Sequence, residues 1–225
     1  MIRRRRETYV GPWLPEPLVG AAEGTEEAVL RQELVSMAVL VALETLSPLE
    51  RAVFVLHEVF GYGHTETAVV LGRSPAAVRQ LAHRAREHVR ARRPRFEADP
   101  ATQARVTEQF VRAATNGDWP ALMELLAPEV TLWTDGGGKV AAAGLRPITG
   151  REKVVRALGG YARRGAALDI QFRPVNGTPS IVVFDGERPH VVIGLDLDLG
   201  LAPGRGPVRA LYALTNPDKL GLVRR

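Results

Sequence analysis

Residues 64–93 read HTETAVVLGRSPAAVRQLAHRAREHVRARR, and this stretch predicts two helices separated by a tight turn. The first helical pattern ends at Leu71-Gly72, where glycine suits the left-handed conformation that closes a helix. The second begins at Ser74-Pro75, because serine is a favoured N-cap and proline fits a first helical turn, whose N–H groups have no intrahelical partner. Two helices joined by so few residues predict a helix-turn-helix.

The second of these helices is amphipathic. Its apolar residues at helical spacing, which we expect to be buried, are Val78, Leu81, Ala82, Ala85 and Val89. Its N-cap and opposite side carry the residues that we predict to contact DNA: Ser74, Arg79, Gln80, His83, Arg84, Arg86 and Arg90. In the major groove, glutamine can read adenine, and arginine can read guanine or hold a phosphate. A solvated basic face on a plain helical hairpin is the alternative.

Charge and composition narrow the class of protein. The chain of 225 residues has a net charge of +5, gathered at Arg3–Arg6 and Arg79–Arg95, which favours a polyanionic partner. It has no cysteine and no membrane-length apolar run, so we expect a cytoplasmic protein without disulfides or membrane spans. The five histidines are scattered without metal-ligand spacing, so we expect no metal and no cofactor.

The N-terminal residues 1–24 are predicted to form an extended arm or linker. Its prolines disfavour a helix, but Trp13 and Leu14 are too apolar for an idle spacer. We therefore expect these two side chains to dock on a folded surface.

Two further helices are predicted before the helix-turn-helix, which completes a domain over residues 25–95. The first spans Thr25–Leu46. The second starts at the capping-box pattern Ser47-Pro48-Leu49-Glu50 and runs to about Phe60. The residues expected on its buried side are Val53, Phe54, Leu56 and Phe60.

Residues 102–225 are predicted to form a separate α+β domain. Helices are expected over Thr102–Thr115, Trp119–Leu126 and Gly150–Arg164. Strands are expected over Glu129–Thr134, Leu168–Pro174, Ser180–Asp185, His190–Leu199 and Val208–Thr215, with tight turns at Asn176-Gly177 and Asp185-Gly186. This order predicts helices packed on one face of a curved antiparallel sheet.

From Leu46 to Arg86 the sequence LSPLERAVFVLHEVFGYGHTETAVVLGRSPAAVRQLAHRAR resembles region 4 of extracytoplasmic-function sigma factors. The matching elements are Leu46-Ser47-Pro48, Glu50-Arg51, Glu66 with Ala68, Leu71-Gly72, Ser74, Val78-Arg79 and Arg84-Ala85-Arg86. The resemblance implies binding to the promoter −35 element and to the RNA polymerase core. Within it, the residues expected on −35 DNA are Arg79, Gln80, His83 and Arg84, whereas Arg86 and Arg90 would hold phosphates.

The C-terminal half looks like the cone-shaped fold of SnoaL-like cyclases, ketosteroid isomerase and nuclear transport factor 2. One sigma-factor subgroup joins region 4 to such an extension and carries three motifs, all present here. They are WLPEP (Trp13, Leu14, Pro15, Glu16 and Pro17), DGGGK (Asp135, Gly136, Gly137, Gly138 and Lys139) and NPDKL (Asn216, Pro217, Asp218, Lys219 and Leu220). The resemblance implies that the extension regulates the sigma factor. The subgroup also has a region 2 before WLPEP. Because this sequence lacks it, we expect a fragment, with a truncated relative as the alternative.

The predicted architecture is thus multidomain: an all-α helix-turn-helix domain (sigma region 4) followed by an α+β cone-shaped SnoaL/NTF2-like domain. We interpret DGGGK as a shaped loop at a domain contact with WLPEP rather than a phosphate loop, since the Walker spacing is missing.

The alternative function is small-molecule binding or isomerase- or cyclase-like activity in the cone. It would need a general base and an oxyanion donor, for which the candidates are Asp196, Asp198, His190, Tyr161 and Tyr212. We expect the two aspartates to face water, and the domain not to be an enzyme. A small apolar ligand could still bind in the cone.

Overall fold

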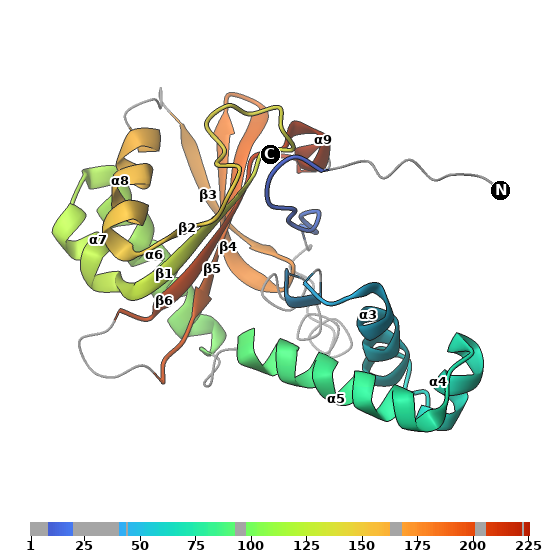
Figure 1. Ribbon diagram of the computed structural model, residues 1–225. Helices are drawn as coiled ribbons and strands as arrows, with labels where there is room; N and C mark the ends of the chain where they lie inside the picture. Colours follow the sequence, from blue (N-terminus) through green and yellow to red (C-terminus); the bar gives the residue numbers. More distant parts are fainter. Residues whose placement is uncertain are drawn as a thin grey trace. The chain divides into compact units, whose positions relative to one another are not determined.

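The computed structural model describes residues 9–19, 41–43, 45–92, 98–162, 168–200, 206–221 and 223–225 (Figure 1). Of the predictions, Arg3–Arg6, most of the helix Thr25–Leu46 and the side chains of Arg90 and Tyr161 lie outside this described part. Residues 41–43 and 45–92 belong to one compact unit, and residues 9–19 with those from 98 onward belong to a second.

The first unit begins with a capped helix, α3, over Pro48–Phe54. The Ser47 hydroxyl and the Glu50 carboxylate each accept a hydrogen bond from the other residue's backbone N–H, so the predicted capping box is confirmed. The helix continues as a π-helix, η1, over Val55–Val59, in which the N–H of Phe60 donates to Val55 O at 3.2 Å. The wider turn leaves the Phe60 side chain 65% exposed, so its predicted burial is wrong.

The helix-turn-helix consists of α4, over His64–Leu71, and α5, over Pro75–Arg92. Gly72 closes α4 in the left-handed conformation, with φ 61° and ψ 43°. All the predicted apolar residues of α5 are buried, against Val53 and Ala68 in one cluster and against Ala42 and Leu46 in another. The predicted bend and the predicted buried face are therefore both confirmed.

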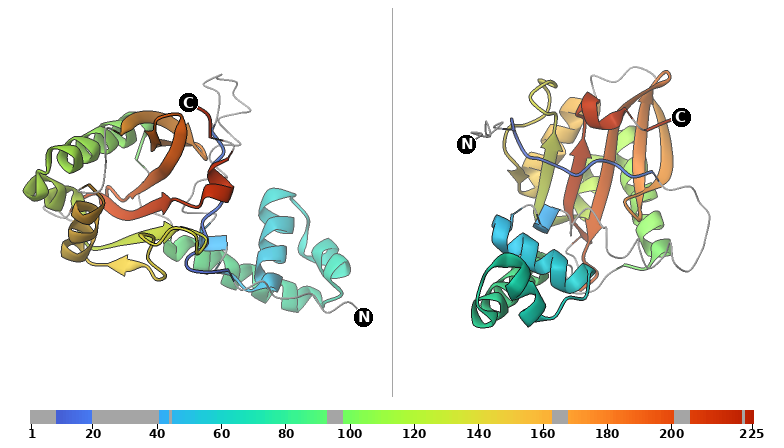
Figure 2. Two further views of the ribbon diagram at one scale, coloured as in Figure 1. Left: turned by 90° about the horizontal axis from the view of Figure 1, so that it is seen from above. Right: turned by 90° about the vertical axis from the view of Figure 1, so that its right-hand side faces the viewer.

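The second unit contains three helices on one face of a sheet (Figure 2). They are α6 over Pro100–Asn116, α7 over Trp119–Leu125 and α8 over Arg151–Ala162. Asp99 and Asp118 cap the first two, because their carboxylates accept hydrogen bonds from N–H groups of the first turn. Gly117, with φ 68°, ends α6 as predicted.

The sheet has the strand order β2-β1-β6-β5-β4-β3. Its strands are β1 over Leu126–Asp135, β2 over Ile148–Thr149, β3 over Asp169–Val175, β4 over Thr178–Asp185, β5 over Arg188–Leu197 and β6 over Val208–Leu214. Adjacent strands are antiparallel except β1 and β6, which pair in parallel. The short strand β2 and this parallel pairing were not predicted, whereas the Asn176-Gly177 turn was, and both of its residues have positive φ.

Apolar side chains from the helices and from one face of the sheet form the core of this unit. Phe110 and Leu122 from the helices pack in one cluster with Val130, Leu195 and Leu211 from the strands. Because side chains alternate along a strand, the neighbouring residues of β4, β5 and β6 point to the opposite face. The N-terminal arm, residues 9–19, crosses that opposite face (Figure 2).

Candidate functional site

The exposed side of α5 carries the predicted DNA contacts. The side chains of Arg79, Gln80, His83 and Arg84 are all exposed, while the apolar stripe on the other side of the same helix is buried. The Ser74 hydroxyl accepts a hydrogen bond from Ala77 N at 3.2 Å, so this residue caps the helix. The helix therefore presents cations and a glutamine to solvent in the arrangement that a major groove accepts.

Two glutamates flank this exposed side. Arg86 Nε lies 2.6 Å from Glu58 Oε1, and Arg84 Nε lies 3.7 Å from Glu50 Oε1. Both pairs are accessible to water, so each contributes little to the free energy of unfolding and serves mainly to orient its arginine.

The folded chain brings two of the five histidines, which are scattered in the sequence, into contact. The rings of His57, in η1, and His64, at the start of α4, meet edge to face with centroids 4.3 Å apart. His57 Nδ1 lies 2.9 Å from the carbonyl oxygen of Tyr62, to which it donates. Burial, and then the charges of His57, Arg86 and Arg79, lower the pKa of His64.

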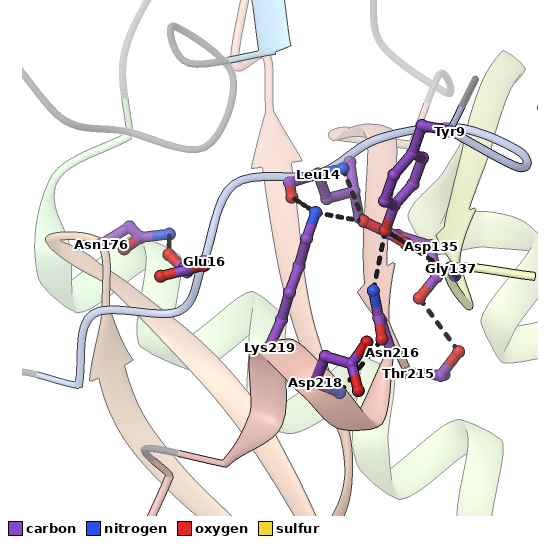
Figure 3. Close-up of polar contacts among 10 residues, drawn as sticks. All are labelled: Tyr9, Leu14, Glu16, Asp135, Gly137, Asn176, Thr215, Asn216, Asp218 and Lys219. Carbon is purple, nitrogen blue, oxygen red and sulfur yellow. Dashed lines mark hydrogen bonds and ion pairs between the residues drawn. The ribbon is translucent and has the colours of Figure 1, made fainter. Parts of the chain in front are cut away.

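A second site lies where the arm crosses the sheet, centred on Asp135 at the end of β1 (Figure 3). This carboxylate is fully buried and accepts four hydrogen bonds. Oδ1 accepts from the Tyr9 hydroxyl at 2.5 Å and from Gly137 N at 3.0 Å. Oδ2 accepts from Leu14 N at 2.8 Å and from Lys219 Nζ at 2.8 Å. One carboxylate thus joins the arm, the glycine loop and the C-terminal motif.

Lys219 is the buried cation of this site and is only 9% exposed. Besides Asp135, its ammonium donates to Leu14 O at 2.5 Å. It also lies over the rings of Trp13, at 4.2 Å, and Tyr9, at 4.8 Å. The cation is therefore paired, hydrogen-bonded and in contact with two aromatic faces, as burial of an ammonium group requires.

The arm alternates between buried and exposed side chains. Leu14, Pro15 and Pro17 are buried, whereas Trp13 and Glu16 are exposed. The predicted docking therefore holds fully for Leu14, while Trp13 remains 38% exposed over the ammonium of Lys219.

The glycines of DGGGK are required by space as well as by backbone conformation. A Cβ atom on Gly137, whose φ is +58°, would lie 2.4 Å from Asn216 Nδ2, and one on Gly138, whose φ is +73°, would lie 2.9 Å from Val10 Cβ. On Gly136 it would meet Ala143 Cβ at 2.5 Å. The loop therefore packs its backbone closely against Val10, Ala143 and Asn216, where no larger residue would fit.

NPDKL forms a short helix, α9 over Pro217–Leu220. Asn216 caps it by accepting from Asp218 N at 3.1 Å and donates through Nδ2 to the Tyr9 hydroxyl at 2.8 Å. Lys139 Nζ pairs with Asp218 at 2.6 Å on the surface. All three motifs thus meet at one site.

Sequence reasoning missed two residues of the arm contact. Tyr9 lies before WLPEP, and burial together with its hydrogen bond to Asp135 raises the pKa of its phenol. Asn176, predicted only as a turn residue, accepts from Leu18 N at 2.8 Å, and its own backbone N–H donates to Leu18 O at 2.9 Å. An asparagine before a glycine predicts a tight turn, but it does not indicate a hydrogen-bond partner 158 residues away.

Asp196, the first candidate for a general base, does not point into the core of the cone. Leu195 and Leu197 point into the apolar core, so Asp196 between them points to the opposite face. The expectation that the aspartates face water is also wrong, because Asp196 and Asp198 are each 8% exposed and Asp196 pairs with Arg209 at 2.9 Å. Within the described residues, no three side chains gather as metal ligands, and no helix has the length and apolar character of a membrane span.

Comparisons with known proteins agree with this geometry. The family described as "Sigma-70, region 4" matches residues 36–89. The ECF RNA polymerase sigma factor SigJ of Mycobacterium tuberculosis H37Rv is 38% identical, over 96% of this chain and 71% of the relative. The probable ECF RNA polymerase sigma factor SigI of the same species is 30% identical, over 99% of this chain and 72% of the relative.

The similarity extends to the three-dimensional structure. The crystal structure of the extracytoplasmic function sigma factor SigJ of Mycobacterium tuberculosis matches with a TM-score of 0.72 at 36% identity, over 95% of this chain and 76% of that chain. A helix-turn-helix unit and a cone-shaped α+β domain in one chain are therefore the fold that was predicted. The chain belongs to the family of ECF RNA polymerase sigma factors.

Proposed function

We propose that this chain acts in transcription initiation by binding −35 promoter DNA through the exposed side of α5 and by contacting the RNA polymerase core through its helix-turn-helix unit. The observation that carries the proposal is the division of α5 into a buried apolar stripe and an exposed stripe of cations and glutamine. A helix that packs on its own unit by one side and offers guanidinium groups on the other fits the recognition position of a helix-turn-helix.

The residues of α5 take different roles in this proposal. Arg79, Gln80, His83 and Arg84 read base edges, because they are exposed around the centre of the polar side. Arg86 and Arg90 hold backbone phosphates, and Ser74 positions the start of the helix. Arg86, held by Glu58 at 2.6 Å, lies at the edge of this side, where a groove wall would come closest.

A fluorescence-anisotropy titration of labelled promoter duplex tests these roles. Arg79→Ala and Arg84→Ala are each expected to weaken binding by roughly tenfold to a hundredfold, and Arg86→Ala is expected to lower the salt dependence by about one unit of slope. Arg105→Ala is the matched control, since it removes an exposed cation from α6 in the other unit. Equal binding by Arg79→Ala, Arg84→Ala and the control would refute the assignment.

We further propose that the α+β domain regulates the sigma factor by holding the arm. The resemblance places WLPEP in the segment between regions 2 and 4, and here that segment is bound through Asp135 and Lys219. Pull-down of core polymerase with the native chain and with Asp135→Asn tests this proposal. Unequal recovery supports regulation by the arm contact, and equal recovery at matched folding contradicts it.

A further inference from the structure

The roles proposed above leave one cluster of side chains on the helix-turn-helix unit only partly explained. We call it the histidine cluster and define it as His57 from η1, His64 from α4, and Arg79 and Arg86 from α5. The two rings are 4.3 Å apart, and both arginines act electrostatically on His64. The helices η1, α4 and α5 thus contribute two imidazoles, which can become cationic, and two guanidinium groups, which are cationic.

Two glutamates bond to residues at or next to the cluster. Glu58 from η1 pairs with Arg86 at 2.6 Å. Glu66 from α4 accepts from Gly63 N at 2.7 Å, directly before His64. A single proton on either ring therefore adds one positive charge beside Arg79 and Arg86. His83, Glu87 and His88 are further titratable groups exposed on α5.

The position of the proton on His57 is fixed. Because Nδ1 donates to Tyr62 O at 2.9 Å, Nε2 is the atom that gains a proton when the ring becomes a cation. Burial and the neighbouring cations disfavour the charged form of His64 in the free protein. An anion beside both rings would offset that repulsion and favour the imidazolium.

We infer that the histidine cluster is a proton-dependent binding site for a backbone phosphate of DNA. The inference rests on the proposed function. When a helix-turn-helix docks, its second helix enters the major groove while its first helix crosses the sugar–phosphate backbone. His64 begins that first helix, so a phosphate at the cluster is held by Arg86 and by a protonated ring, while Arg79 adds positive charge beside it and keeps its proposed contact with a base edge. Binding therefore takes up about one proton.

The direction of the pH dependence follows from two pKa values of His64. The pKa is lowered in the free protein, and a phosphate beside the ring would raise it in the complex. Affinity rises as pH falls through the pKa of the complex and levels off below the pKa of the free protein. Between these two values the affinity changes by about tenfold per pH unit for each linked proton. The lower limit of this window lies below the ordinary imidazole pKa, because the pKa of free His64 is lowered.

The test is calorimetric titration of the chain with a short duplex in two buffers of different ionisation enthalpy, from about pH 5.5 to about pH 8. The native chain is expected to take up about one proton on binding, and this measurement needs no variant. His57→Gln/His64→Gln is expected to lose that uptake and most of the slope, since glutamine can still donate to Tyr62 O. His190→Gln, an exposed histidine in the other unit, is the matched control and keeps both.

The outcomes separate this inference from the proposed function. Binding by the native chain without proton uptake, or a folded double variant that keeps the native slope, overturns the histidine cluster and leaves DNA binding standing. Failure to bind the duplex at any pH overturns both. Inorganic phosphate is titrated alongside; proton uptake equal to that with DNA would identify a site for free anions and refute a backbone contact.

Discussion

Replacing Asp135 by asparagine is expected to release the arm from the α+β domain. The change keeps the shape of the side chain but removes the charge that faces Lys219 at 2.8 Å. It also leaves only one oxygen, so either Leu14 N or the Tyr9 hydroxyl loses its acceptor and meets an NH2 group instead. The ammonium of Lys219 then stays buried without a counterion unless the arm leaves and water enters.

The magnitude follows from burial. Breaking a buried ion pair by removing one partner costs about 3–5 kcal/mol. The lower end applies here, because Lys219 keeps its bond to Leu14 O and its contacts with the rings of Trp13 and Tyr9. A loss of about 3 kcal/mol in docking corresponds to an increase of about a hundredfold in the population with a released arm.

Thiol labelling of Leu14→Cys measures that population. The native chain has no cysteine, and Leu14 is fully buried, so a single thiol reacts only when the arm opens. With the reporter present in every variant, Asp135→Asn is expected to react about a hundredfold faster. Asp135→Asn/Lys219→Met is expected to recover part of the protection, because the stranded charge is gone.

Lys139→Ala is the matched control for this experiment. It removes another cation of the same motif contact, but its pair with Asp218 is exposed and contributes at most about 1 kcal/mol. Labelling should therefore stay within about fivefold of the native rate. Equal labelling of Asp135→Asn and Lys139→Ala would refute the conclusion that the buried carboxylate holds the arm.

Three further substitutions test single features of the fold. Gly137→Ala places a Cβ atom 2.4 Å from Asn216 Nδ2 at a position with a φ of +58°. It should therefore weaken arm docking by about 1–3 kcal/mol, measured with the same thiol reporter. A labelling rate equal to that of the native chain would contradict this. Thr67→Val removes a buried hydroxyl that has no hydrogen-bond partner, and it should leave the melting temperature unchanged or raise stability by about 1 kcal/mol; a lower melting temperature would show that the hydroxyl has a partner. Ser47→Ala breaks the capping box and should cost about 1 kcal/mol in urea unfolding at neutral pH. Hydrogen bonds from Ser47 lower the pKa of Glu50 in the folded chain. The part of the stability that depends on the Glu50 charge is therefore present above the unfolded-state pKa of Glu50 and is lost as pH falls through its folded-state pKa. The difference in stability between the variant and the native chain should accordingly shrink in acid.

Local signals predicted most of the fold. The helix-turn-helix was predictable because its bend depends on one glycine and its cap on one serine, at Gly72 and Ser74. The strand β2 has only Ile148 and Thr149, too few residues for an alternating pattern. The π-helix after Phe54 was missed because its residues fit an α-helical pattern equally well, and only the hydrogen bond from Phe60 to Val55 reveals it.

The sequence predicted where the arm docks but not which polar contacts hold it there. Resemblance brought WLPEP and DGGGK together, yet nothing local indicates that Asp135 is buried and four times hydrogen-bonded. Asp196 was misjudged for a related reason: its alternation with leucines predicts the face correctly, but its burial depends on Arg209 and on what covers that face. Pairings between distant residues carry no periodic signal, so charged side chains in strands are the least predictable part.

Arm docking also affects the freedom of the helix-turn-helix unit through the length of chain that joins the two. Residues 20–37 separate the docked arm from that unit and can span at most about 60 Å when extended. The other connection, residues 93–97, is much shorter. While the arm is bound, both ends of the helix-turn-helix unit are tethered to the α+β domain. When the arm leaves, only the short connection remains, so more orientations become available and the entropic restraint falls. We therefore expect Asp135→Asn to leave the helix-turn-helix unit freer to reorient than it is in the native chain.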